Sequence, residues 1–308
     1  MILLAGIGSE SPIVLLAEAL DDLGCEHRLL HQRRSADCEM ELTIDAGGVG
    51  GWLRLEDEML DLAEVTAVYP RLMDDRLLPE LRDEPPDSPA RRHTRGLHDV
   101  FYRWMEVTPA RVINRSDPQG SNGAKPYQAQ LIAAYGLRVP ETLITNDPAD
   151  VLAFRRDHGE IIYKSMSGVR SIVKRFDEDD LARLDDIRWC PVQFQALIPG
   201  DDMRVHVVGR DVHATRIVSD ATDYRYARQS GGSAELCAAE IDDDLAERCI
   251  ALTAGLGLEL AGIDLRISPD GVATCFEVNP SPSYSYYQAH TGQPIAASLA
   301  RLLASGAP

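Results

Sequence analysis

Charged and polar side chains interrupt two apolar runs near the C-terminal end of the chain. Asp264 lies within LAGIDLRI, and Glu277 and Asn279 alternate along FEVN. Alternate residues of a strand face the same side, so Glu277 and Asn279 share one face. If the two strands are neighbours in one sheet, two carboxylates and an amide oxygen converge on a site that suits Mg²⁺. A hydrogen-bonded structural carboxylate pair at the rim of a sheet is the alternative.

The first third of the chain alternates extended and helical patterns. Apolar spacing predicts three strands and one helix that ends in glycine, at 2–7, 27–32, 65–70 and 12–24. This order indicates a small parallel α/β layer.

Two further segments of this region do not fit that layer. Residues 40–60 alternate across the turn GGVGG and predict a hairpin, since a strand-like WLRL follows the glycines where a phosphate loop would need a helix. The stretch 83–95 is rich in proline and charge and predicts an exposed loop.

The rest of the chain segregates helices and strands into an α+β pattern. Strands are predicted at ETLIT, IIYKS, PVQFQAL, LAGIDLRI and VATCFEV, and two more meet at Gly209-Arg210-Asp211. We therefore predict three domains or subdomains, at residues 1–112, 113–197 and 198–308.

Two lysines are candidates for binding phosphate. Lys164 lies in the strand IIYKS, where an ammonium is costly to bury without a partner. Ser165, Ser167 and Gly168 follow it in a small-residue turn whose N–H and hydroxyl groups could close over phosphate oxygens. Lys125 lies at a helix start, where the dipole favours anions. An edge-strand lysine and a solvated lysine are the alternatives.

Three arginines follow in and after the predicted strand pair: Arg204, Arg216 and Arg225. Planar guanidinium groups suit the clamping of phosphate and carboxylate groups. Surface salt bridges with the many acidic residues are the alternative for each of them.

The charge balance excludes some classes of partner. The chain has 49 acidic and 31 basic residues and a formal charge of -18, which argues against binding to nucleic acid or to an anionic membrane.

Location and cysteine chemistry follow from short patterns. The opening MILLAGIGSESP has no positive charge before its apolar run, so it predicts a buried strand and no signal peptide, and no stretch has the apolar length of a spanning helix. We expect a cytoplasmic protein. The six cysteines are scattered singly, which predicts small core residues in a reducing compartment.

The order of these pieces resembles the ATP-grasp superfamily over about residues 110–305. The motifs that carry the resemblance are the two lysines, QFQ at 193–195, DMR at 202–204, Asp264 and the EVNPSP that begins at Glu277. The chain is similar to RimK-like carboxylate–amine ligases and to graspetide (microviridin-type) peptide macrocyclases. The resemblance implies a small N-terminal parallel α/β domain and two α+β subdomains with ATP between them.

The resemblance also implies roles for the candidate residues. Lys125 and Lys164 would hold phosphates, and the segment from Gln193 to Gln195 would be the hinge whose backbone reads adenine. The implied nucleotide contacts further include Ser165, Ser167, Gly168, Gln193, Phe194, Gln195 and Asp202. One or two Mg²⁺ ions, or Mn²⁺ instead, would be bound by Asp264, Glu277 and Asn279. The catalytic cations would be Arg204, Arg216 and Arg225. The turn SMSGVRS has one glycine and the hinge has Gln193, where relatives often have more glycines and a glutamate.

The expected function is an ATP-dependent, ADP-forming ligase that makes an amide or ester from a carboxylate through an acyl phosphate. One alternative is a macrocyclising ligase acting on a ribosomally made peptide, with 221–233 or 83–95 bordering a leader groove. Another is a nucleotide-binding regulator without turnover. A small molecule or a peptide would supply the carboxylate and the amine or hydroxyl, and a homodimer or homotetramer is left open.

Overall fold

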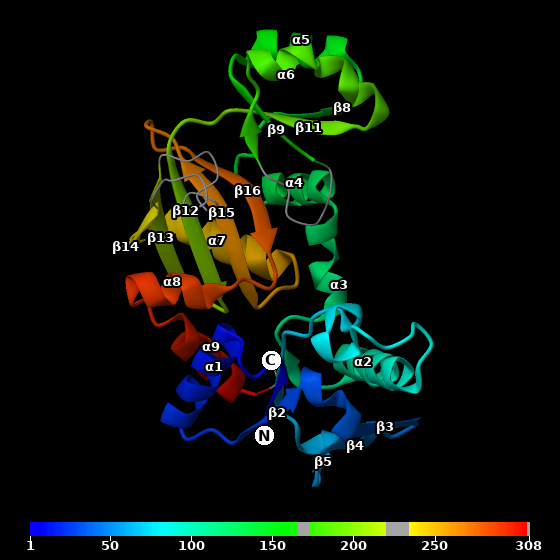
Figure 1. The fold of residues 1–308 in the computed structure, drawn as a ribbon. Helices are drawn as coiled ribbons and strands as arrows, with labels where there is room; N and C mark the ends of the chain where they lie inside the picture. Colours follow the sequence, from blue (N-terminus) through cyan, green and yellow to red (C-terminus); the bar gives the residue numbers. More distant parts are fainter. Residues whose placement is uncertain (166–172, 220–233, 307–308) are drawn as a thin grey trace.

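The computed structural model describes residues 1–165, 173–219 and 234–306, and it contains three sheet-based bodies stacked in one column (Figure 1). The N-terminal domain lies at one end, a central subdomain at the other, and a large antiparallel sheet between them. Ser167, Gly168, Arg225 and the stretch 221–233 lie outside the described residues.

The N-terminal domain is built on the predicted parallel layer. Its strands pair in the order β2 (His27–His31), β1 (Ile2–Gly6), β6 (Ala67–Pro70) and β7 (Arg111–Val112). Helices α1 (Ser11–Asp22) and α2 (Pro89–Val107) pack on opposite faces: Leu4 of β1 shares a core with α1, and Leu3 shares another with α2. Because both faces are covered, every residue of β1 is buried.

The predicted hairpin forms a separate antiparallel sheet of β3 (Cys38–Asp45), β4 (Gly48–Leu55) and β5 (Glu58–Asp61). Its turn lies at residues 46–47, earlier than the glycine-rich centre suggested. The predicted loop 83–95 is partly wrong. Helix α2 begins within it at Pro89, because the Ser88 hydroxyl accepts a hydrogen bond from the Arg91 N–H and caps the helix.

The central subdomain is a four-stranded antiparallel sheet in the order β10 (Lys174–Arg175), β9 (Ile161–Ser165), β11 (Val192–Ala196) and β8 (Thr142–Thr145). Helices α5 (Pro148–His158) and α6 (Glu178–Ala182) cover one face. Phe176 and Phe194 meet edge to face in the core between sheet and helices, with ring centroids 6.0 Å apart. The other face is left for the cleft described below.

The C-terminal sheet is antiparallel, with the strand order β14 (Ala234–Ala239), β13 (Asp211–Ser219), β12 (Asp201–Val208), β15 (Leu260–Ile267) and β16 (Ala273–Asn279). One face packs on α7 (Asp243–Gly255) and α4 (Lys125–Ala134). The chain then continues through α8 (Tyr284–Thr291) and α9 (Ile295–Ala304), and α3 (Ser116–Gln119) precedes α4. Short 3₁₀ helices occupy Gln32–Asp37, Leu62–Glu64, Asp75–Leu77, Pro79–Leu81, Gly120–Gly123 and Leu184–Trp189.

Two helices share cores across the predicted boundaries. Ile132 of α4 is buried against the C-terminal sheet, and Leu299 of α9 is buried in one core with Leu16 of α1 (Figure 1). The division into residues 1–112, 113–197 and 198–308 stays a prediction.

The cysteines differ in burial. Cys38, Cys249 and Cys275 are buried as expected, but Cys190 and Cys237 are exposed, and all six thiols are free. Burial raises the pKa of the Cys249 thiol to about 12. In the described part of the chain, no helix has both the length and the apolar character that a membrane span requires.

Candidate functional site

The structure brings Asp264, Glu277 and Asn279 together. Asp264 pairs directly with Glu277 across β15 and β16, and Gly262 pairs with Asn279 two residues further along. Directly opposed residues of an antiparallel pair point to the same face, so the three oxygen-bearing side chains line one face of the sheet. The Asp264 and Glu277 side chains are 27% and 25% exposed. They therefore lie at the sheet surface, within reach of a ligand.

Two cations neutralise this acidic pair. Arg204, opposite Asp264 on β12, places Nη1 2.6 Å from Asp264 Oδ1. Lys125, at the start of α4, places Nζ 3.1 Å from Glu277 Oε2 and donates a 2.7 Å hydrogen bond to Asn122 Oδ1. Burial opposes ionisation of Glu277, but Lys125, Lys164 and Arg204 outweigh it and hold its pKa below the ordinary value.

This donor set fits Mg²⁺. Carboxylate and amide oxygens are its preferred protein ligands, and it usually keeps waters and substrate phosphates in its remaining positions. Across the described residues, no three or more His, Cys, Asp or Glu side chains gather closely enough to hold a metal by themselves. Two carboxylates and one amide therefore suit a metal whose other ligands come from a nucleotide.

Arg204 is fixed in its position. Its side chain is 6% exposed, and its guanidinium lies 5.6 Å from the centre of the Tyr287 ring of α8. A Cβ on Gly262 would come within 2.2 Å of Arg204 Nη2, so only glycine at this position lets the guanidinium lie flat on β15. Beneath it, the buried His206 ring packs edge to face on Tyr287, with centroids 4.8 Å apart. Arg204 is thus preorganised beside Asp264.

Two adjoining cavities of about 280 and 120 Å³ lie between the central and C-terminal sheets. Lys125 lines the larger, Asp264 and Glu277 line the smaller, and Lys164 and Gln195 line both. The cleft thus ends at the acidic pair. Its walls come from two different sheets.

The predicted hinge segment, residues 193–195, lies on β11 in the middle of the central sheet. Gln193 pairs with Lys164 and faces the cleft with Gln195, whereas the Phe194 side chain is buried in the core on the other face of the sheet. Because β11 lies between β8 and β9, the backbone groups of 193–195 pair within the sheet. The part of this segment that reaches the cleft is therefore its two glutamine side chains. Ser165 is exposed at the end of β9, on the face of Tyr163.

Asp202 and Arg216 occupy different faces of the C-terminal sheet. Asp202 shares the face of Arg204 and lines the smaller cavity, where Arg266 Nη2 lies 2.6 Å from its Oδ1. Arg216 pairs with Met203 in the β12–β13 register, which turns it to the opposite face. There it is half exposed and forms a 2.6 Å ion pair with Asp201. The structure does not bring Arg216 to the acidic pair, which corrects its expected catalytic position.

Two buried side-chain amides, which the sequence analysis did not identify, hold the strands that carry the acidic residues. Gln128 of α4 hydrogen-bonds both to the N–H and to the carbonyl of Val278. Asn114 donates to the carbonyls of Leu260 and Pro280, at 2.8 and 2.7 Å. A signal for Gln128 existed, because it lies four residues before the buried Ile132 and three after Lys125, on one helix face.

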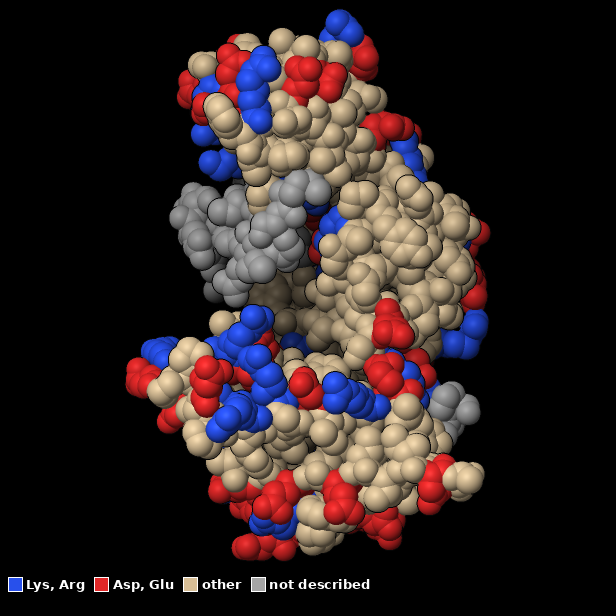
Figure 2. Space-filling view, turned by 90° about the vertical axis from the view of Figure 1, so that its right-hand side faces the viewer, with Lys and Arg blue, Asp and Glu red and all other residues tan. Residues whose placement is uncertain are grey.

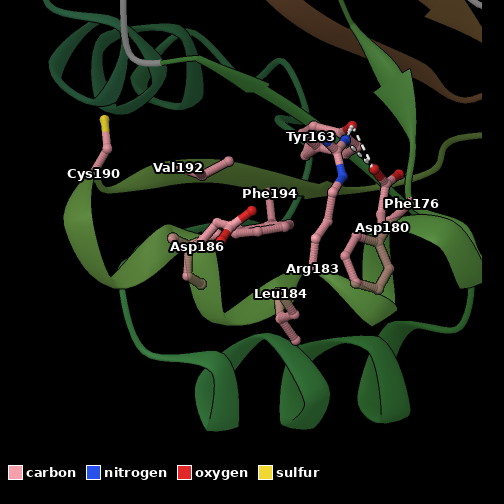
Figure 3. Close-up of a pocket in the computed structure, with 10 residues that line it drawn as sticks. Tyr163, Phe176, Asp180, Arg183, Leu184, Asp186, Cys190, Val192 and Phe194 are labelled. Atoms are coloured by element: carbon pink, nitrogen blue, oxygen red, sulfur yellow. Dashed lines mark hydrogen bonds and ion pairs between the residues drawn. The ribbon is translucent and has the colours of Figure 1, made fainter.

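A separate cavity of about 200 Å³ lies on the helix-covered face of the central sheet (Figure 3). Phe176 and Phe194 form its apolar wall. The Tyr163 hydroxyl donates a 2.8 Å hydrogen bond to Asp180 Oδ1 at its edge, and Arg183 donates to the same hydroxyl at 3.1 Å. Phe194 and Gln193 face opposite sides of the sheet, so this cavity is distinct from the cleft.

Two sheets that face each other across a cleft with lysines and a carboxylate pair define a nucleotide-dependent ligase of the ATP-grasp fold. The model of the RimK-like ATP-grasp domain matches residues 124–303, more than half of the chain, so the protein belongs to the RimK-like ATP-grasp family. It is an ATP-dependent ligase, and the expected fold and family are confirmed. No curated protein sequence matches the chain.

Solved structures of similar fold include peptide ligases. The ATP-grasp ligase PsnB, complexed with a phosphomimetic variant of its minimal precursor, Mg and ADP, is 26% identical, with a TM-score of 0.79 and coverage of 99% of this chain and 97% of PsnB. A RiPP-associated ATP-grasp ligase of Chryseobacterium gregarium, with ADP and a leader and core peptide, is 21% identical, with a TM-score of 0.82 and coverage of 100% and 97%. The macrocyclase MdnC of Microcystis aeruginosa MRC, bound to precursor peptide MdnA, is 22% identical, with a TM-score of 0.79 and coverage of 99% and 100%.

Proposed function

We propose that the chain activates a carboxylate of a ribosomally made peptide as an acyl phosphate and joins it to an amine or hydroxyl, releasing ADP and phosphate. The observation that carries this proposal is the convergence of Asp264, Glu277 and Asn279 with Arg204 at the end of a lysine-lined cleft. Fixed charges of this kind stabilise phosphoryl transfer, in which the protein mainly positions groups and offsets charge.

The nucleotide would lie in the cleft between the two sheets. Lys125 and Lys164 would bind its phosphates, and Gln193 and Gln195 line the wall available to the base. Asp264, Glu277 and Asn279 would hold Mg²⁺, which, when bound, neutralises charge on the phosphates. Lys125 forms an ion pair with Glu277, and with Mg²⁺ bound to Glu277 the ammonium would be available to a phosphate.

Arg204 would stabilise the reacting groups. A carboxylate that approaches a γ-phosphate brings two anions together, and a nearby guanidinium reduces their repulsion. Tyr287 and Gly262 hold Arg204 in place before the substrates arrive, so little reorganisation is needed at the moment of reaction.

A peptide is the substrate class that the similar structures favour, since PsnB and MdnC were solved with precursor peptides. A cavity of about 530 Å³ offers room for such a chain beside Arg71 and Ser281, and Ser281 hydrogen-bonds to Asn279. The description of a carboxylate–amine or carboxylate–hydroxyl ligase is part of this proposal.

Purified protein with Mg·ATP, offered peptide and small-molecule fractions separately, tests the proposal. We expect ADP release that depends on peptide and a product lighter by one water for each bond formed. Lys164→Met should raise the KM for ATP about tenfold or more, as loss of one hydrogen bond to a charged group does. Lys174→Met is the matched control, since Lys174 is exposed on β10. ADP release with small molecules alone would contradict the peptide assignment, and no release with either would contradict ligase activity.

A further inference from the structure

The largest of the four cavities described lies where the N-terminal domain meets the loop after β16. It encloses about 530 Å³ and is lined by Ser9, Glu10, Arg71, Tyr102 and Ser281, among others. Figure 2 shows the surface hollowed between the lower and upper parts of the molecule on the side that carries α2 to α4. Glu10 and Arg71 follow the carboxyl ends of β1 and β6, the edge where open parallel sheets bind ligands.

An ion pair forms one wall of this cavity. Arg71 donates from Nε and Nη2 to Glu10 Oε1, at 3.0 and 2.5 Å. Its Nη1 donates to Ser281 Oγ and to the Pro282 carbonyl, each at 3.2 Å. Glu10 neutralises the charge of Arg71. The Arg71 side chain is only 9% exposed, and its N–H groups donate to the protein. Arg71 is therefore poorly suited to capture a substrate carboxylate.

Glu10 retains accepting capacity. Both hydrogen bonds from Arg71 end on Oε1, and within the described part of the chain no hydrogen bond reaches Oε2. The Glu10 side chain is 33% exposed and lines the cavity. An ionised carboxylate only accepts hydrogen bonds, so its free oxygen selects an N–H or O–H group and repels a second carboxylate.

A continuous chain of contacts connects this cavity to Asn279. Glu10 contacts Arg71, Arg71 contacts Ser281, and the Ser281 N–H donates a 2.9 Å hydrogen bond to Asn279 Oδ1. The two ends differ in charge chemistry. Arg204 and Lys125 supply cations at the end where a carboxylate must meet phosphate, whereas Glu10 supplies an acceptor at the other.

We propose that this cavity binds the nucleophile of the ligation, a side-chain amine or hydroxyl, and that Glu10 orients it through a hydrogen bond to Oε2. This inference rests on the proposed ligase function. It divides the two substrate groups by charge: the donor carboxylate lies at Arg204, and the hydrogen-bond-donating nucleophile lies at Glu10. Both belong to the peptide, and they meet beside Asn279.

The test separates activation of the donor from capture of the nucleophile. Hydroxylamine attacks the carbonyl carbon of an acyl phosphate, the bond from that carbon to the phosphate oxygen breaks, and phosphate leaves with the electron pair, giving a hydroxamate. Hydroxamate therefore reports activation, and the water-loss product reports ligation. Glu10→Gln keeps the size of the side chain and removes its charge.

We expect Glu10→Gln to lower the ratio of ligated product to hydroxamate by about tenfold or more, the effect of losing one hydrogen bond to a charged group. Glu18→Gln, on the exposed side of α1, is the matched control and should keep the wild-type ratio. Precursor peptides with lysine or with serine at the acceptor position distinguish an amine from a hydroxyl. Glu10→Asp, which keeps the charge, should recover part of the ratio and serves as the second variant if Glu10→Gln unfolds.

An equal fall in both products would overturn the inference, because Glu10 would then act on donor activation or on the fold. An unchanged ratio would overturn it as well. If the wild-type protein forms neither hydroxamate nor ligated product, the proposed function itself fails, and that result is distinct from a changed ratio.

Discussion

The side-chain amide of Gln128 forms two hydrogen bonds with the main chain of Val278. Its Nε2 donates to the Val278 carbonyl at 2.9 Å, and its Oε1 accepts from the Val278 N–H at 3.0 Å. Since β16 is the edge strand of its sheet, these backbone groups would otherwise be buried without a partner. Val278 lies between Glu277 and Asn279, so a helix side chain fixes the strand that carries the acidic site.

Gln128→Ala should weaken the use of Mg²⁺. Loss of a residue that orients metal ligands costs about 10- to 100-fold in metal affinity, so the Mg²⁺ concentration for half-maximal ADP release should rise by that factor. The free energy of unfolding should fall by about 1–3 kcal/mol, because buried groups of Val278 are left unsatisfied. Gln130→Ala, exposed on the same helix, is the control. Loss of stability with an unchanged Mg²⁺ requirement would show that Gln128 supports only the fold.

Glu277→Gln should abolish Mg²⁺-dependent turnover. The substitution keeps the shape of the side chain but removes the charge that pairs with Lys125 and would bind the metal. We expect a fall of more than about 100-fold, beyond the effect of residues that merely support a metal ligand. The thermal unfolding midpoint should change little, because Glu277 is partly exposed at the sheet surface. Turnover at the wild-type rate would remove Glu277 from the metal site.

The face on which the acidic residues lie could be predicted from the sequence. Alternation along a strand places Glu277 and Asn279 together, and the apolar run around Asp264 identifies its strand. Arg216 shows where the interpretation stopped short. The turn at Gly209 and Arg210 pairs Val208 with Asp211. Continuing this register along both strands pairs Arg204 with Thr215, so Arg216 lies on the opposite face from Arg204.

Contacts between distant segments could not be predicted in this way. Gln128 recognises the main chain of Val278, 150 residues away, and Asn114 recognises that of Leu260. A hydrogen bond to the main chain does not depend on which amino acid the partner residue is, so the sequence does not reveal it. The ion pair of Glu10 with Arg71 likewise depends on which loops follow neighbouring parallel strands. Such contacts are set by the packing of domains, which local patterns do not encode.

Gly262→Ala should displace Arg204 and slow the reaction. A Cβ at this position would come within 2.2 Å of Arg204 Nη2, so the guanidinium must leave Asp264 or the face of Tyr287. Loss of one positioned stabilising group typically lowers kcat by about 100- to 1,000-fold. Gly96→Ala is the control, because a Cβ there meets no atom within 4 Å. Steady-state ADP release measures both variants, and equal rates would mean that the position of Arg204 has no part in catalysis.

His206 should make the fold less stable as the pH falls. Its ring is fully buried, and neither ring nitrogen has a hydrogen-bond partner among the described residues. Burial, then the charges of Arg204 and His213, hold its pKa well below the ordinary 6.5. His206 therefore binds a proton near pH 6.5 in the unfolded chain but stays neutral at that pH in the folded protein.

Below that pH, each unit of acidification should remove up to about 1.4 kcal/mol from the free energy of unfolding, and above it this contribution should be constant. Urea unfolding of wild type and His206→Phe at pH 5, 6, 7 and 8 measures the effect. Phenylalanine keeps an aromatic ring against Tyr287 but cannot titrate. The change in the free energy of unfolding between pH 6 and 5 should therefore be smaller in His206→Phe, by the amount that corresponds to about one bound proton. His213, whose pKa burial also lowers, is present in both proteins, so its own titration is common to both slopes. Identical slopes would mean that His206 accepts a proton in the folded protein.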